Sequence, residues 1–327
     1  MPEVVTMDQK WGLQQPGQHS PVYIEQPNWF VNGFGHSANQ MTDALAAYQL
    51  FFDLLPAPDD QAQLQEHDRL LTLFESASNR AVASNEVLFS SLAKLFDIPG
   101  ISAREMDREE YYKAFQSIRN DEGYIRVAQQ ESAVLLSLGS YENAGIIKAN
   151  AENNLEYRYA LRDLSPYVLL NVPDVYSEHN TNHSLDGYSE SVPQGMTDDY
   201  LADRSTMLYA MLQRNLNDSF RAPSVGIGNE ITFIDESLGL LFSTNQNIDP
   251  HHRYSDRYTN RQFAFGDDGS DVLLGGRKSD RLYGGAGVDA LNGGIAGEDY
   301  LEGGIGDDIY QVTSADITKI KDAQGAD

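Results

Sequence analysis

Apolar residues recur at helical spacing through most of the first two thirds of the chain. Helices bounded by proline, glycine or a polar capping residue are expected at residues 41–55, 61–76, 84–96, 107–118, 152–163 and 198–216. Asp107 with Glu110 forms a capping-box pattern, and Thr197 can cap the last of these helices. The first helix is expected to bury Leu45, Tyr48, Phe52 and Leu55. These segments predict an α-helical domain over residues 40–228, preceded by an extended segment at 1–39.

The helical pattern ends after Arg221. Two short β-prone runs, 231–234 and 240–243, flank a turn-like segment and predict a β-hairpin. We expect residues 229–265 to form a β adaptor that starts the structure following it, because the terminal rung of a solenoid needs a cap. Residues 312–327 are expected to be a C-terminal strand or a truncated end.

Residues 266–311 repeat with a period of nine. Five units begin at Gly266, Gly275, Gly284, Gly293 and Gly303, and the fourth unit carries one extra residue. Each unit has glycine first, an aspartate near position six and a large apolar or aromatic residue near position eight. A fixed short period predicts a solenoid, in which the residue at position eight points inward from a short strand. Two units would make one full coil, so alternate repeats should stack.

The matched aspartates predict calcium binding. They are Asp271, Asp280, Asp289, Asp299 and Asp308. Stacking of alternate repeats would pair Asp271 with Asp289, Asp280 with Asp299, and Asp289 with Asp308, giving about three Ca²⁺ sites completed by backbone carbonyls. Ordering nine residues costs on the order of 9–18 kcal/mol, whereas one buried leucine returns about 1.5–3 kcal/mol. We therefore expect disorder without the metal and a parallel roll with it.

These repeats resemble the RTX family, the glycine-rich nonapeptide proteins secreted by Gram-negative bacteria. The resemblance implies a calcium-binding parallel β-roll in which carbonyls at turn positions one to four join the aspartate at position six. The turn residues that it assigns are Gly284, Gly285, Ala286 and Gly287 in the third repeat and Gly303, Gly304, Ile305 and Gly306 in the fifth. Asp267, Lys278 and Ala296 depart from the family pattern. The site of Asp280 and Asp299 is therefore expected to be the weakest.

Composition fits an extracellular calcium-binding protein. The net charge is −26, which argues against nucleic acid or an anionic membrane surface as a partner. The chain has no cysteine, no apolar signal-peptide core and no run of eighteen apolar residues, so we expect no disulfide and no membrane span. The RTX resemblance implies export through the type I secretion machinery. We expect a fragment, because the sequence stops soon after the last repeat.

Catalytic motifs are largely missing. The HExxH motif is absent, and residues 35–39 resemble a lipase nucleophile elbow but lack its last glycine, so Ser37 is expected to be a loop serine. His179 with His183, and the adjacent His251 and His252, could bind a metal but are expected to be exposed loop histidines. We expect no catalytic and no cofactor-binding residue in this chain.

Three functional alternatives stay open at this stage. The chain is a non-catalytic module of an adhesin or haemolysin-like toxin, a remnant of a secreted lipase- or esterase-like hydrolase, or a protein that cleaves itself at Asp249-Pro250 when calcium arrives. The segment from Tyr200 through the adaptor resembles the region upstream of the repeats in large bacterial RTX haemolysins and lipases, which assigns no catalytic residue. The predicted fold class is multidomain α + β, a helical N-terminal domain followed by a parallel β-roll, or β-solenoid.

Overall fold

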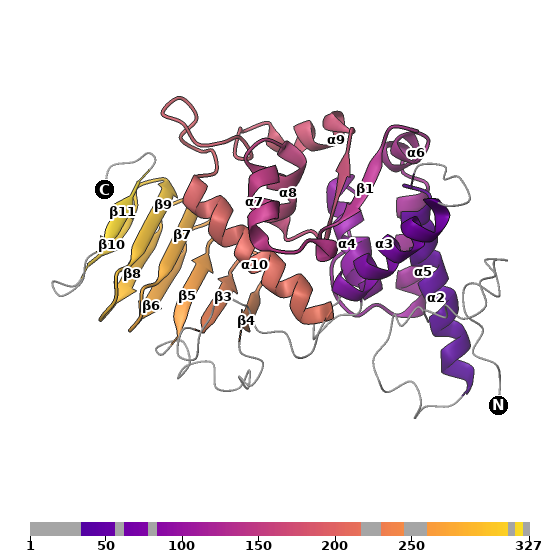
Figure 1. Cartoon of the computed structure of the whole chain (residues 1–327), viewed down its shortest axis with the longest axis horizontal. Coiled ribbons are helices and arrows are strands. Elements are labelled where there is room, and N and C mark those ends of the chain that lie inside the picture. The colour runs from indigo at the N-terminus through magenta and orange to yellow at the C-terminus, as the bar shows by residue number, and fades with distance from the viewer. Residues whose placement is uncertain are drawn as a thin grey trace. The chain divides into compact units, whose positions relative to one another are not determined.

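A computed structural model describes residues 34–55, 62–77, 84–216, 230–244, 260–312 and 318–322 (Figure 1). These residues form two compact units. The first contains the described residues up to Asn143 together with Arg162–His179 and Met211–Leu216, and the second contains Ala144–Leu161, Asn180–Ala210 and the described residues from 230 onward. A helical N-terminal region is therefore followed by strands, as predicted. The domain boundaries predicted from the sequence stay a prediction, and the compact units group the residues differently.

Helices of the first unit that overlap predicted ones are α2 (Phe34–Phe52), α3 (Ala62–Ala77), α4 (Ser84–Leu95) and α5 (Arg108–Arg119). The short helices α6 (Glu122–Ala128) and α9 (Pro173–Ser177) were not predicted. The capping box of Asp107 and Glu110 is confirmed at the start of α5. Helix α2 begins at Phe34, earlier than expected, and its buried face differs from the prediction. Phe51 is buried and packs edge-on against Phe74 at 5.7 Å, whereas Phe52 is 39% exposed.

A two-stranded ribbon in the first unit was not predicted. Strands β1 (Val134–Ser137) and β2 (Tyr167–Leu170) pair in antiparallel fashion, with Val134 opposite Leu170. Both are short apolar runs buried in the core, where Phe51 packs edge-on against Tyr167 at 5.3 Å. A four-residue run with almost no polar residue has no apolar–polar period that distinguishes a strand from a helix. The part of residues 40–228 that the structure describes is therefore mainly, but not wholly, helical.

The second unit carries two sheets. The predicted hairpin is confirmed as β3 (Ile231–Asp235) and β4 (Leu240–Ser243), which pair in antiparallel fashion. The following strands are β5 (Arg261–Phe265), β6 (Val272–Gly276), β7 (Arg281–Ala286), β8 (Ala290–Gly294), β9 (Tyr300–Ile305), β10 (Ile309–Gln311) and β11 (Lys319–Lys321). One sheet has the order β11-β9-β7-β5-β3-β4 and the other β10-β8-β6. From β5 onward the chain alternates between the sheets, and all pairings of these strands are parallel.

This alternation stacks alternate repeats and is consistent with a parallel β-roll (Figure 1). Val272 lies beside Ala290, and Ala290 beside Ile309, two repeats apart at each step. The residues at position eight fill the space between the sheets. Leu273, Leu282, Leu291 and Leu301 are at most 2% exposed and form one cluster with Ile234 and Ala264, and Tyr310 packs against it. The inward direction predicted for position eight is confirmed.

Helices also belong to the second unit. These are α7 (Ala144–Ala151), most of α8 (Leu155–Asp163) and the part of α10 (Asp198–Leu216) up to Ala210. Thr197 caps α10 as predicted, accepting a hydrogen bond from the Tyr200 amide at 3.0 Å. Arg204 of α10 forms a buried ion pair with Asp235 at the end of β3, and its guanidinium lies 4.7 Å from the ring centre of Phe265. This helix therefore packs against the six-stranded sheet.

Candidate calcium-binding turns

The turns between the strands approach one another very closely. Gly285 and Gly287 have φ of +112° and +124°, a region that favours glycine. A Cβ atom at Gly285 would lie 2.3 Å from the carbonyl oxygen of Asp267, and one at Gly287 would lie 2.2 Å from that of Gly269. Glycine therefore lets the carbonyls of one turn reach the backbone of the next turn in the same stack.

The repeat aspartates form two columns, as alternate stacking predicts. In the first column, Asp271 donates its amide to Oδ1 of Asp289 at 2.8 Å, and Asp289 donates its amide to Oδ1 of Asp308 at 2.9 Å. In the second, the amide of Asp280 donates to Oδ1 of Asp299 at 2.9 Å. Each predicted pair of aspartates is therefore joined directly, from the backbone of one member to the side chain of the other.

The second carboxylate oxygen turns back toward the first glycine of its own repeat. A Cβ at Gly284 would lie 2.3 Å from Oδ2 of Asp289, and one at Gly303 would lie 2.1 Å from Oδ2 of Asp308. Any side chain at position one would therefore displace the carboxylate. In the second repeat the same oxygen of Asp280 accepts a hydrogen bond from the Gly276 amide at 2.5 Å.

Burial disfavours the charged form of these carboxylates when no cation is bound. Asp280 and Asp289 are 0% exposed, and Asp299 and Asp308 are 3% exposed. Burial raises the pKa of Asp280 to about 7, although hydrogen bonds from the Gly276 and Gln262 amides oppose the rise. Burial also raises the pKa of Asp289 to about 6, and the charge of Asp308 adds to the effect.

Asp289 also has an unsatisfied oxygen. Its Oδ2 is buried and accepts no hydrogen bond from the part of the chain that the structure describes. A buried carboxylate oxygen without a partner is costly unless a cation or a donor reaches it. Hard carboxylate and carbonyl oxygens are the ligands that calcium prefers, so the residues present fit this ion. Within the described ranges, no three or more acidic, histidine or cysteine side chains gather into a metal-holding cluster.

The predicted carbonyl ligands lie along the same stack. The carbonyl oxygens of Gly284, Gly285 and Gly287 face the neighbouring turns at Gly266, Gly304 and Gly306. The carbonyl of Ile305 differs from these glycine carbonyls, because it accepts a hydrogen bond from the Gly287 amide at 2.7 Å. Lys278, which departs from the family pattern, is exposed, and its turn stacks like the others, with its carbonyl against Gly297. The assignment of individual calcium ligands stays a prediction.

The other candidate residues have separate surroundings. Position 37 lies within helix α2 rather than in a loop, and the side chain of Ser37 is outside the described residues. His179 is not the exposed loop histidine that was expected, because it lies in the 3-10 helix Glu178–Asn180, its side chain is only 11% exposed and its ring lies 2.9 Å from the carbonyl of Leu95. His183 is exposed as expected and lies 2.8 Å from Asp186, so each ring has its own partner. His251, His252 and the Asp249-Pro250 bond lie outside the described residues.

Parallel strands joined by stacked turns with buried aspartates define a class of calcium-binding repeat proteins. Residues 265–295 and 296–310 match the family model described as RTX calcium-binding nonapeptide repeat, so this part of the chain consists of RTX repeats, as the sequence pattern predicted. The predicted resemblance upstream of the repeats stays a prediction. No curated protein and no solved structure matched the chain. Among the helices that the structure describes, none combines the length and apolar character needed to cross a bilayer.

Proposed function

We propose that this chain is an extracellular RTX protein whose repeats fold into a calcium-loaded β-roll. The column of buried aspartates within the matched repeats carries the proposal, above all Asp289 with its unsatisfied oxygen. The proposed ligands are the five repeat aspartates and the turn carbonyls of the third and fifth repeats. About three ions would then lie between alternate turns, with six to eight oxygens each.

The electrostatic cost supports a folding role for the ion. The pKa of Asp280 rises from an ordinary 3.8 to about 7, so keeping this one carboxyl ionised in the metal-free fold costs about 4 kcal/mol. Whole domains are stable by only about 5–15 kcal/mol. A divalent cation between two such carboxylates removes the cost and adds favourable contacts, so binding and folding should be one event.

The proposal includes the domain organisation and the location. Residues 40–228 would be the helical domain, 229–265 the adaptor, 266–311 the roll and 312–327 the C-terminal strand. RTX repeats are typical of secreted proteins, and an affinity in the millimolar range would keep the roll unfolded until it meets extracellular calcium. Type I export is part of the proposal. Detection of the chain in the medium only from cells that carry a type I exporter would support it.

A calcium titration of the whole chain tests the function. Far-UV circular dichroism should gain β signal as calcium rises to about 0.1–1 mM, the affinity range of extracellular modules. Isothermal titration calorimetry should report about three ions, and magnesium should substitute poorly because it requires a small octahedral shell. An unchanged spectrum at about 10 mM calcium, roughly ten times the weak end of that range, would refute the proposal.

A further inference from the structure

The outer face of the six-stranded sheet carries two rows of aromatic and charged side chains. Strand register places Phe263, Arg281, Tyr300 and Lys319 in one row and Phe265, Tyr283, Glu302 and Lys321 in the other. Between these rows, Ala264, Leu282 and Leu301 of β5, β7 and β9 point to the core, whereas Ile320 of β11 is 44% exposed. The three-stranded sheet differs, because Val272, Leu274 and Ile309 on its strands are 51% to 68% exposed.

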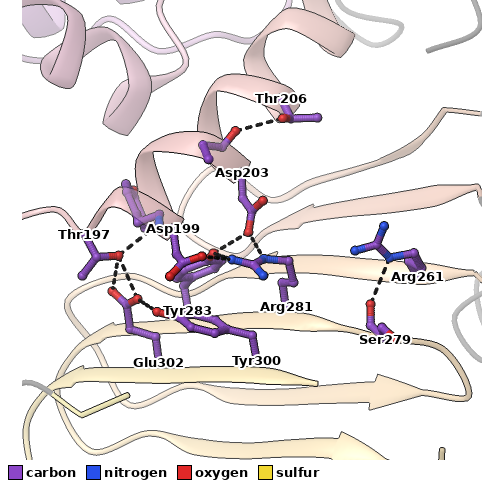
Figure 2. Close-up of polar contacts among 12 residues, drawn as sticks. Thr197, Asp199, Asp203, Thr206, Arg261, Ser279, Arg281, Tyr283, Tyr300 and Glu302 are labelled. Atoms are coloured by element: carbon purple, nitrogen blue, oxygen red, sulfur yellow. Dashed lines mark hydrogen bonds and ion pairs between the residues drawn. The ribbon is translucent and has the colours of Figure 1, made fainter. Parts of the chain in front are cut away.

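Helix α10 binds the two rows through carboxylates (Figure 2). Arg281 of β7 donates to Oδ1 of Asp199 at 2.7 Å and also forms an ion pair with Asp203. The Tyr283 hydroxyl donates to the same carboxylate of Asp203. The Arg281 guanidinium lies 4.5 Å from the ring centre of Tyr300 on the neighbouring strand. One arginine therefore connects the helix with two strands of the repeats.

A second contact joins the start of the helix to β9. The Thr197 hydroxyl donates to Oε2 of Glu302 at 2.9 Å, while the Tyr300 hydroxyl donates to the same oxygen at 2.6 Å (Figure 2). The ring of Tyr200 packs edge-on against Phe265 at 5.6 Å. The capping residue of α10 is therefore also a partner of the sheet.

The ion pair of Arg281 and Asp203 is largely shielded from water. The side chains of Arg281 and Asp203 are 21% and 11% exposed. Burial raises the pKa of Asp203, although the charge of Arg281 opposes the rise. Removing one partner of such a pair leaves the other charge partly desolvated, which is costly.

The strands that contact α10 begin immediately after the aspartates of the proposed calcium-binding turns. Arg281 follows Asp280, and Tyr300 follows Asp299, so ordering of these turns also orders the strands that face the helix. The ion pair of Arg204 and Asp235 is different, because β3 lies before the repeats. Helix α10 is therefore attached once to the adaptor and again to the repeats.

We propose that Asp203 and Thr197 are positioning residues for the calcium sites: through Arg281 and Glu302 they hold β7 and β9 on helix α10 and raise the affinity of the repeats for calcium. This inference rests on the proposed calcium-dependent folding. Coupling between two sites is reciprocal. Calcium therefore strengthens the docking of residues 198–210 by the same free energy that the docked helix adds to calcium binding.

Calcium titration of full-length variants tests this coupling. Asp203→Asn should raise the half-saturating calcium concentration about fivefold or more, the lower end of typical allosteric couplings. Asp198→Asn is the matched control, because Asp198 is an exposed neighbour in the first turn of the same helix and makes the same change of charge. It should leave the calcium affinity unchanged. Hydrogen exchange in residues 198–210 should slow on calcium addition in the parent chain and slow less in Asp203→Asn.

Two results with these variants would overturn the inference. An unchanged affinity in Asp203→Asn, or an equal loss in both variants, would exclude coupling through this contact. If Asp203→Asn does not reach the parent spectrum at saturating calcium, Thr197→Val is tested instead and should raise the half-saturating calcium concentration at least about fivefold. Thr197→Ser should bind calcium with the affinity of the parent chain, because serine keeps the hydroxyl. If the parent chain itself does not respond to calcium, the proposed function is wrong. If the parent chain responds and the variants bind calcium with the same affinity, only the coupling through helix α10 is wrong.

Discussion

Acid should partly replace calcium in stabilising the metal-free repeats. The pKa values of Asp280 and Asp289 rise to about 7 and about 6, chiefly because burial disfavours the charged form. A carboxyl whose pKa is higher in the folded than in the unfolded chain holds its proton more tightly when folded. The fold is therefore most stable below the unfolded pKa, and stability is lost as the pH rises to the folded value.

The size of the effect follows from Asp280. With a pKa of 3.8 in the unfolded chain and about 7 in the fold, linkage predicts about 2–3 kcal/mol of stability regained between pH ~7.5 and pH ~5. Asp289 acts in the same direction. In saturating calcium the sign reverses, because protons compete with the ion for the same carboxylates.

Hydrogen exchange with mass spectrometry measures this effect on the whole chain. In EGTA, peptides within residues 261–312 should exchange near their intrinsic rates at pH ~7.5, where the metal-free repeats are unfolded, and should gain protection at pH ~5 from the stability of up to about 2–3 kcal/mol that protonation returns. Asp280→Asn should lose most of this difference. Asp307→Asn, which changes an exposed carboxyl of the last turn, should retain it. Greater stability at the higher pH, or an undiminished pH dependence in Asp280→Asn, would show that the buried carboxyls do not control the metal-free fold.

Three further variants probe the turns and the buried ion pair. Asp289→Ala should weaken calcium binding in calorimetry more than Asp280→Ala, because Asp289 is the middle member of a column of three; equal losses would contradict the assignment of shared sites. Gly306→Ala should cost at least about 1 kcal/mol of roll stability in calcium-dependent melting, because φ there is +145°, and an unchanged melting temperature would exclude the close stacking. Arg204→Met should cost about 3–5 kcal/mol in urea unfolding, and adding Asp235→Leu should recover most of it. A double variant as unstable as the single one would show that packing of Arg204, rather than its charge, matters.

The repeats could be predicted because their structure is encoded locally. Glycine at fixed positions permits the tight turns, and a leucine at position eight, such as Leu282, must point between the sheets because side chains alternate along a strand. The capping patterns at Asp107 and Thr197 were equally local and were confirmed. The sequence by itself therefore determined the period, the stacking of alternate repeats and most of the helices.

Local patterns failed where distant segments decide the structure. The strands β1 and β2 are too short and too uniformly apolar to show a period, and each is defined only by the other. The start of α2 was misplaced because residues 34–40 lack the apolar spacing on which the prediction relied. Pairing between distant segments therefore decided the β1–β2 ribbon.

Only the tertiary structure decided that α10 covers the outer face of the six-stranded sheet. One signal was present in the sequence: Arg281, Tyr283, Tyr300 and Glu302 occupy the outward strand positions of the second and fourth repeats, where the first repeat has Val272 and Leu274. The partner of Arg281, Asp203, lies 78 residues away along the chain. An outward-facing arginine is equally compatible with water, and it becomes a structural contact only when folding brings a carboxylate to it and excludes the solvent.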